Sequence, residues 1–170
     1  AERSRGLTFS PDGTKLYNCA DDESIYQYDL TTPFDLSTAA DNGISFDTSS
    51  QSGTPWDISF NSNGTKAVVL SNNASVQVLY QYSLSTAYNI STASYDSVSF
   101  DTSSQDVTPT GGRFNNDGTK FFWMGHGTQA VYEYNLSTAF DLSTISYSGT
   151  SLDVSGQVSF LPSIFFNTGG

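Results

Sequence analysis

The stretch that decides the fold is Phe-Ser-Pro-Asp-Gly-Thr-Lys at residues 9–15. Its pattern, Phe-x-x-x-Gly-Thr-Lys, returns 51 residues later at 60–66 and a further 54 residues along at 114–120. Each copy contains Asp-Gly or Asn-Gly, which is typical of a tight hairpin turn because glycine adopts the positive φ that the turn requires. The chain therefore carries three copies of one unit, each marked by the same predicted turn.

Two further landmarks repeat in step with this turn. Tyr-Gln-Tyr-Asp-Leu at 26–30 returns as Tyr-Gln-Tyr-Ser-Leu at 80–84 and as Tyr-Glu-Tyr-Asn-Leu at 132–136. A near-copy of Ser-Thr-Ala-Phe-Asp-Leu-Ser-Thr follows each one, and Phe-Asp-Thr-Ser-Ser-Gln occurs at 46–51 and again at 100–105. These matches define a repeat of about 52 residues.

Each repeat predicts four short strands. The first precedes the hairpin turn, as at 56–60, and the second is almost wholly apolar, as at 16–20, which is typical of a strand covered on both faces. The third alternates apolar and polar residues, as at 26–30, and the fourth is brief, around 44–46. No stretch shows the apolar period of a stable helix.

Four-stranded antiparallel units joined head to tail predict an all-β fold made of β-propeller blades. Within one repeat domain spanning 1–170, blade 1 covers about 6–55, blade 2 about 56–110 and blade 3 about 111–162. A β-solenoid is the main alternative. Its strands are usually parallel, whereas the tight Asp-Gly turns require antiparallel hairpins.

The stretch that follows blade 3 matches the beginning of another repeat. Residues 163–166 predict the first strand of a fourth blade, and 166–170 align with the hairpin turn at 114–118. Three blades do not close a ring without unusual geometry, and open sheet edges favour pairing with another chain. Two alternatives follow: the chain is a piece of a longer propeller, or copies associate to complete a ring or a fibre.

Two blocks resemble a known family of repeats. Pro-Asp-Gly-Thr-Lys-Leu-Tyr at 11–17 and Tyr-Gln-Tyr-Ser-Leu-Ser-Thr-Ala at 80–87 are similar to β-propeller repeats of bacteriophage tail-fibre and other virion proteins. Similar units occur in secreted or surface-layer proteins of bacteria and archaea. The resemblance covers 6–166 and implies an extracellular, cell-surface or virion location and a structural or adhesive role. It supplies no catalytic motif.

The charge balance argues against nucleic acid as a partner. Six basic residues against 17 acidic ones give a net charge of −11, which repels phosphate backbones and anionic membranes. The three lysines share one position of the repeat, so they do not gather into a basic patch; they are Lys15, Lys66 and Lys120. No apolar run is long enough to cross a bilayer, so we also predict no membrane insertion.

Residue types that carry catalysis are scarce. One histidine excludes a His-rich metal site, and no Gly-x-Ser-x-Gly turn is present, so we predict no catalytic residue, no metal and no cofactor. Asp12 and Asp117 occupy the repeat position that Asn63 fills in the second copy, which indicates turn residues. Asp35 and Asp141 alternate with asparagine in the same way. Cys19 and Trp123 lie in apolar runs and are expected in the core.

Five residues are candidates for contact with a ligand. Trp56 stands at the entrance to a first strand, where an indole could stack on a sugar ring. Arg113, in the matching strand of the third repeat, either pairs with an acid between blades or faces a ligand. His126 lies between two glycines at a predicted loop tip. Asp21 and Asp22 belong to an acidic cluster that forms a solvated loop or helps to hold a calcium ion, although no Asp-x-Asp-x-Asp-Gly loop is present.

These observations support three functional hypotheses, in order of preference. The first is a non-enzymatic binding or adhesion module for surface glycans or protein. The second is a purely structural component of a fibre, tail or surface layer. The third is a glycan-degrading enzyme that uses paired carboxylates. The expected partners are other copies of the chain or further blades of a longer chain, together with a cell-surface glycan or protein.

Overall fold

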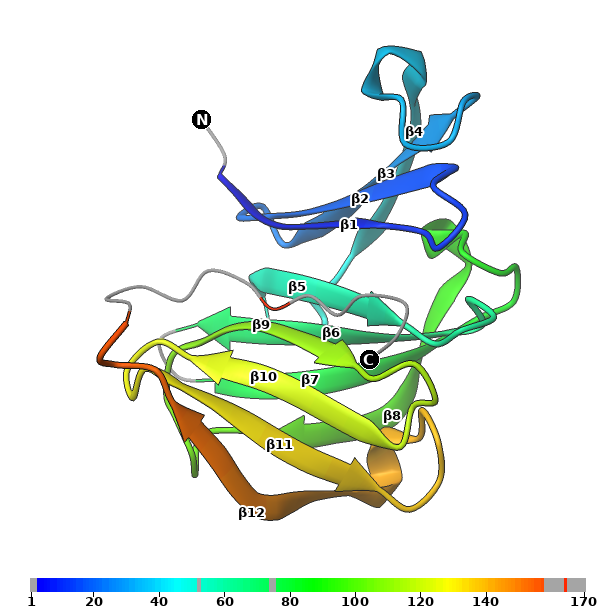
Figure 1. Ribbon diagram of the computed structural model, residues 1–170. Coiled ribbons are helices and arrows are strands. Elements are labelled where there is room, and N and C mark those ends of the chain that lie inside the picture. Colours follow the sequence, from blue (N-terminus) through cyan, green and yellow to red (C-terminus); the bar gives the residue numbers. More distant parts are fainter. Residues whose placement is uncertain (1–2, 52, 74–75, 158–163, 165–170) are drawn as a thin grey trace.

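The computed structural model describes residues 3–51, 53–73, 76–157 and 164, and within them three four-stranded antiparallel sheets (Figure 1). In each sheet the strands lie in the order of the sequence, so every sheet is a simple meander. The strands are β1 (Ser4–Phe9), β2 (Lys15–Ala20), β3 (Ser24–Leu30), β4 (Ala39–Asp47), β5 (Pro55–Phe60), β6 (Lys66–Asn73), β7 (Val76–Leu84), β8 (Ala93–Asp101), β9 (Pro109–Phe114), β10 (Lys120–Gly125), β11 (Ala130–Leu136) and β12 (Ile145–Asp153).

The hairpin turn after the first strand of each sheet forms as the sequence predicts. Gly64 has a φ of +70°, and the Asn63 side chain accepts hydrogen bonds from the backbone N–H of Thr65 at 3.1 Å and from its hydroxyl at 2.6 Å. Asp12 and Asp117 make the same contacts in the other two sheets. The alternation of aspartate and asparagine at this position is therefore explained by turn geometry.

The first strands of the three sheets lie side by side at the centre of the molecule, in the order β1, β5, β9 (Figure 1). The approach of β1 to β5 depends on Gly6, because a Cβ atom there would lie 2.5 Å from the carbonyl oxygen of Trp56. The last strands, β4, β8 and β12, form the far edge of each sheet. Sheets that share an inner axis and pack face to face are the blades of a β-propeller.

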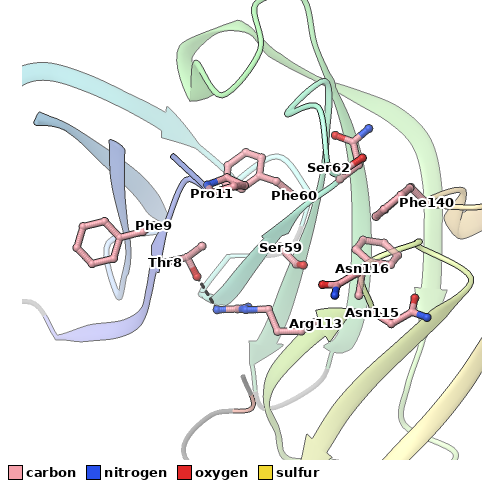
Figure 2. A pocket seen from close by; sticks show the side chains of 12 residues that line it. Thr8, Phe9, Pro11, Ser59, Phe60, Ser62, Arg113, Asn115, Asn116 and Phe140 are labelled. Atoms are coloured by element: carbon pink, nitrogen blue, oxygen red, sulfur yellow. Dashed lines mark hydrogen bonds between the residues drawn. The ribbon is translucent and has the colours of Figure 1, made fainter. Parts of the chain in front are cut away.

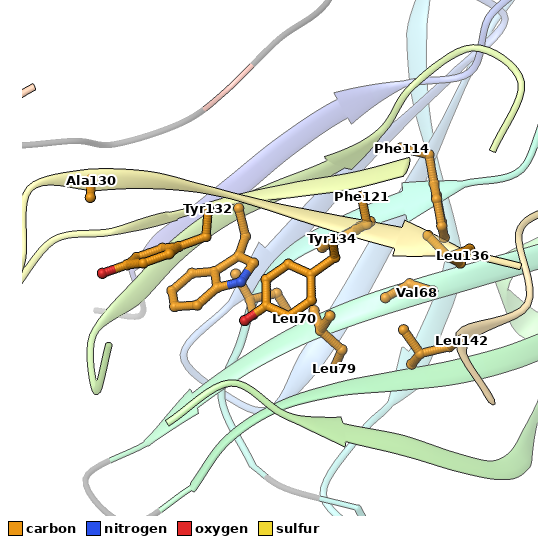
Figure 3. Close-up of a cluster of buried hydrophobic side chains, with 11 residues drawn as sticks. Val68, Leu70, Leu79, Phe114, Phe121, Ala130, Tyr132, Tyr134, Leu136 and Leu142 are labelled. Carbon is orange, nitrogen blue, oxygen red and sulfur yellow. The ribbon is translucent and has the colours of Figure 1, made fainter. Parts of the chain in front are cut away.

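Two apolar clusters fill the spaces between neighbouring sheets. Along β6, Ala67 and Val69 pack toward the first sheet, whereas Val68 and Leu70 pack toward the third. Figure 3 shows the cluster between the second and third sheets, where Val68 and Leu70 face the tyrosines of β11. The prediction that the apolar second strand is covered on both faces is confirmed for this middle sheet.

Other details of the fold confirm or correct the sequence predictions. Trp123 and Cys19 are fully buried, as predicted, and burial raises the pKa of the Cys19 thiol. The prediction of a brief fourth strand is wrong, because β4, β8 and β12 each span nine residues. These strands carry mostly exposed polar side chains, so apolar runs mark only part of their length. Three 3-10 helices were also not predicted: η1 (Leu36–Thr38), η2 (Ile90–Thr92) and η3 (Leu142–Thr144).

The predicted extra strand at 163–166 lies outside the described residues except for Ile164, which is not in a strand.

Candidate functional site

The meander gives the molecule two rims with different loops. The turn rim carries the β1–β2, β5–β6 and β9–β10 hairpin turns and the three 3-10 helices. The connection rim carries the β2–β3, β6–β7 and β10–β11 turns and the segments that lead from one sheet to the next. Because the inner strands run parallel to one another, their carboxyl ends meet at the turn rim and their amino ends meet at the connection rim.

A groove of about 360 Å³ opens where the inner strands reach the turn rim (Figure 2). This volume is at the lower end of the range of small-molecule sites in proteins. Its lining combines aromatic rings with hydroxyl, amide and guanidinium side chains. Its lining consists of Thr8, Phe9, Pro11, Ser59, Phe60, Asn61, Ser62, Arg113, Phe114, Asn115, Asn116 and Phe140.

Arg113 holds the three inner strands together beside this groove. Its Nη1 atom lies 2.5 Å from an Asp57 carboxylate oxygen and 3.0 Å from the carbonyl oxygen of Ile58, and its Nη2 atom lies 2.5 Å from the Thr8 hydroxyl. The side chain thus reaches from β9 across β5 to β1. The prediction that Arg113 pairs with an acid between blades is confirmed, and contact with a ligand stays a prediction.

Asp57 is a buried carboxylate whose partners come from two blades. Besides Arg113, the backbone N–H of Gly112 donates to it at 3.0 Å, and the N–H of Ile58 donates at 2.9 Å. Burial raises the pKa of Asp57, while Arg113 and these N–H groups act in the opposite direction. A carboxylate with this many donors fixes the positions of the strands that supply them.

The carboxylates considered for a glycan-degrading enzyme are engaged in their own turns. Asp12 accepts hydrogen bonds from the Ser10 hydroxyl at 2.6 Å and from the Thr14 N–H at 3.0 Å, which lower the pKa of its carboxyl. Asp35 and Asp141 cap η1 and η3 by accepting from the N–H two residues ahead. The interpretation of these positions as turn residues is confirmed.

The connection rim brings two of the predicted residues, Trp56 and Asp21, together around Arg5, an arginine that was not predicted. The guanidinium of Arg5 lies 4.5 Å from the centre of the Trp56 ring and also pairs with Asp21. Asp22 accepts from the Ser24 N–H at 3.1 Å and from the Tyr26 hydroxyl. The loop is half-buried and bonded rather than fully solvated. One face of the indole is already occupied by Arg5.

His126 lies at the β10–β11 turn, also on the connection rim. Its backbone N–H donates to the carbonyl oxygen of Thr108 at 3.0 Å, which ties this turn to the segment between the second and third sheets. Nearby, the Asp106 carboxylate accepts from both the N–H and the hydroxyl of Thr128. Burial alone would raise the pKa of Asp106, but these hydrogen bonds and those from Thr108 hold it below its ordinary value. The structure does not bring His126 close to Arg113, which lies toward the opposite rim.

The groove itself was not predicted as a site. Its polar residues Thr8 and Ser59 occupy the repeat position that Arg113 fills in the third copy, immediately before the repeated phenylalanine. A polar residue in that position in all three repeats is a signal that could have located the inner-strand ends. Among the described residues, no cluster of three or more His, Cys, Asp or Glu side chains could hold a metal ion. Nor does any helix among them have the length and apolar character needed to span a membrane.

No protein-family model matches the chain, and no curated protein matches it. Solved structures do match. One is a candidate 6-phosphogluconolactonase from Bacteroides fragilis, with a TM-score of 0.64, 10% identity, and coverage of 89% of this chain and 39% of that one. Another belongs to a nidogen–laminin complex, with a TM-score of 0.56 and 14% identity; the match covers 86% of this chain and 48% of that one. A third is the structure of the WD40 repeats of RRP9, with a TM-score of 0.52 and 14% identity; the match covers 88% of this chain and 38% of that one.

These structural similarities establish the fold of the chain but not its function. The neighbours are propellers of the WD40 type and its relatives, so the chain has the β-propeller architecture predicted from its repeats. It spans between about two fifths and one half of the length of these structures.

Proposed function

We propose that the protein is a non-enzymatic binding module that takes a surface glycan into the groove at the turn rim. The observation that carries this proposal is the groove's lining, in which aromatic rings stand beside hydroxyl and amide groups. Sugars present apolar ring faces and many hydroxyls, and a site of this composition offers partners for both. The scaffold beneath is braced by Arg113, so the groove exists before the ligand arrives.

The carboxylates considered for catalysis are engaged in structural hydrogen bonds, which favours a binding function over an enzymatic one. In the turns, the carboxylates of Asp12 and Asp35 accept hydrogen bonds from nearby backbone N–H and hydroxyl groups. Asp57 is buried beneath Arg113. An extracellular, cell-surface or virion location belongs to the same proposal, and it rests on the polar acidic composition and on the resemblance of the repeats.

Bulky substitutions at the mouth of the groove test the proposal. Ser62 and Asn116 are exposed lining residues, so S62W and N116W fill the groove without removing core side chains. We expect both variants to lose binding on a glycan array and to whole cells, by about tenfold or more. The matched control is S104W, because Ser104 is an exposed serine on the connection rim, away from the groove. A blank array and blank cells with the unsubstituted protein, or equal binding by all three variants, would overturn the proposal.

A second candidate function is a structural role in a fibre, tail or surface layer. The observation that favours it is the pair of open sheet faces at the two ends of the stack, where Leu36 and Leu152 are exposed. Ordered assemblies seen by electron microscopy would support this role. Assemblies that persist in S62W and N116W would separate it from glycan binding.

A further inference from the structure

Among the described residues, the first and third sheets each pack against a neighbouring sheet on one face only. Leu7 of the first sheet and Phe34 and Leu36 of its β3–β4 connection are exposed, Leu36 to 61%. On the third sheet Leu152 is 63% exposed and borders a second groove, of about 320 Å³. Large apolar side chains gathered on a face of a soluble protein mark a surface that binds something.

The repeat shows what covers the same positions elsewhere in the chain. Leu36 corresponds to Ile90 and Leu142, and each of these is only 1% exposed because the preceding sheet packs on it. Leu152 corresponds to Phe100, which packs into the cluster between the second and third sheets. The open face of the first sheet and the open face of the third sheet are therefore the two halves of an interface that the chain already builds twice.

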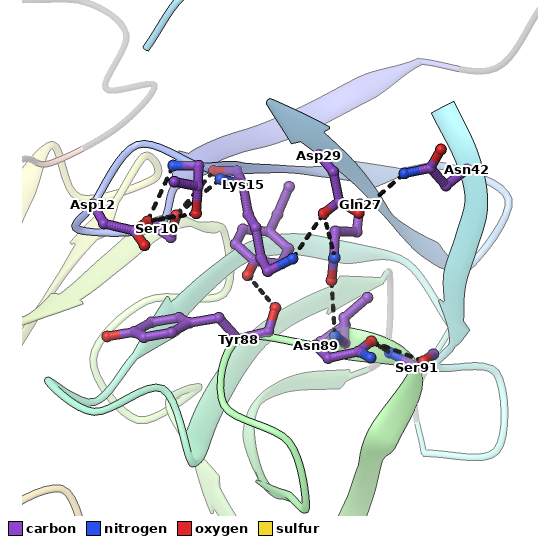
Figure 4. A network of polar contacts seen from close by, with 12 residues as sticks. Ser10, Asp12, Lys15, Gln27, Asp29, Asn42, Tyr88, Asn89 and Ser91 are labelled. Carbon is purple, nitrogen blue, oxygen red and sulfur yellow. Dashed lines mark hydrogen bonds and ion pairs between the residues drawn. The ribbon is translucent and has the colours of Figure 1, made fainter. Parts of the chain in front are cut away.

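A hydrogen bond fixes the register of both existing interfaces. Oε1 of Gln27 accepts from the N–H of Ile90 at 3.0 Å, in the first turn of η2 on the next sheet (Figure 4). Oε1 of Gln81 accepts from the N–H of Leu142 in η3 at 2.7 Å. The side-chain amide of each glutamine donates to a carboxylate on its own sheet, Asp29 for Gln27 and Asp96 for Gln81.

Glu133 occupies this glutamine position in the third sheet and lines the second groove. Lys120 holds its carboxylate at 2.8 Å. A carboxylate accepts from a backbone N–H more strongly than an amide oxygen does. The open face of the third sheet thus keeps the acceptor that the interface uses. The exposed η1 on the first sheet, beginning at Leu36, carries the matching N–H.

We propose that the open face of the third sheet binds the open face of the first sheet in a second copy of the chain. Glu133 then accepts from the N–H of Leu36 of the second copy, and Leu152 covers the apolar face around it. When both such contacts form, two copies close a ring of six blades, which is within the range of natural propellers.

The mass of the full chain in solution is the first test. Light scattering coupled to size exclusion should give twice the chain mass of 18.3 kDa, with dissociation on dilution. A single-chain mass at the highest soluble concentration would overturn the proposal. A mass that grows without limit would also overturn it, because an open filament does not close into a ring.

Face-specific variants test the head-to-tail geometry. L36E blocks only the first-sheet face and L152E blocks only the third-sheet face, and both residues are exposed, so folding is preserved. Each variant alone should remain a single chain, and an equimolar mixture should recover 1:1 pairs through the one intact contact. V107E, at an exposed apolar residue on the connection rim, is the matched control and should behave like the unsubstituted chain. Pairing that survives both variants, or a mixture that fails to pair, would contradict the proposal.

Glu133 supplies the finer test. E133Q reproduces the residue found in the other two sheets, so pairing should persist with a similar dissociation constant. E133A removes the acceptor and should weaken pairing by about tenfold. Equal dissociation constants for E133A and E133Q would exclude the proposed hydrogen bond. Circular dichroism spectra identical to that of the parent chain show in each case that the sheets remain folded.

Discussion

Arg113 and Asp57 form the most buried ion pair among the described residues. Neither charge would be stable alone in this position, because desolvation of an uncompensated ion is costly. The pair also has donors and acceptors on every side, with Gly112, Ile58 and Thr8 completing its contacts. These two side chains therefore link the three inner strands to one another.

Removal of the cation should destabilise the fold strongly. We expect R113M to lower the free energy of unfolding by about 3–5 kcal/mol, because Asp57 remains buried without its partner. The control is R5M, since the pair of Arg5 with Asp21 is more exposed and is expected to contribute about 1 kcal/mol or less. Urea denaturation of both variants measures the difference. Equal losses for R113M and R5M would show that the buried pair has no special role.

At the scale of the element, an aromatic ring packs against the glycine of each hairpin turn that follows an inner strand. Phe34, Tyr88 and Phe140 all have positive φ, and their rings lie against Gly13, Gly64 and Gly118, where a Cβ atom would stand. In the third sheet the ring of Phe140 also contacts Phe114, with centroids 5.2 Å apart. The turn, the inner strand and the loop before the 3-10 helix are thereby joined into one unit.

Substitution of the turn glycine should disrupt this unit. In G118A the added Cβ must displace the Phe140 ring, and the backbone at a φ of +73° disfavours any side chain. We expect a loss of at least about 1–2 kcal/mol in the free energy of unfolding. G156A, where no atom lies within 4 Å and the φ is ordinary, should be nearly neutral. Thermal or urea unfolding compares the two; equal stability would disprove the role of this packing.

How far the sequence predicts the molecule depends on the kind of interaction. The turns and the two-sided second strand follow from short patterns, such as Asp-Gly and the apolar run at 67–70, so their prediction is confirmed. The groove is made by side chains from three repeats, Thr8, Ser59 and Arg113, that meet only after the sheets stack. No local sequence pattern predicts contact between residues this far apart in the chain. The contact of Arg5 with Trp56 was missed for the same reason.

At the scale of the whole molecule, the pKa values of many aspartates are shifted in one direction. Hydrogen bonds from hydroxyl and N–H groups lower the pKa of Asp12, Asp35, Asp47, Asp101, Asp117, Asp141 and Asp153 below 3.8. For Asp29 and Asp106 burial acts in the opposite direction, but hydrogen bonds outweigh it. Asp57 is shifted upward by burial. The predominant effect makes the folded state release protons more readily than the unfolded chain.

Acid should therefore destabilise the protein. Because the unfolded chain binds more protons than the folded state in the acidic range, stability is present above a pH of about 4 and is lost as the pH falls through the lowered pKa values. We expect the urea midpoint to decrease steadily from about pH 5 to about pH 3. D117N, which places in the third sheet the side chain that Asn63 supplies in the second, should keep the turn and reduce this decrease. A midpoint that rises on acidification would contradict the prediction.

The meander order of the strands has a consequence for how such a protein can change in evolution. Each of the three sheets that the structure describes is built from strands consecutive in the sequence, so the strands of one repeat pair only with one another. Duplication or deletion of a gene segment that begins and ends within the links before β5 and β9 would add or remove a whole blade without altering any strand pairing. Blade number is then a quantity that recombination can change in single steps, while the surfaces between blades remain the same.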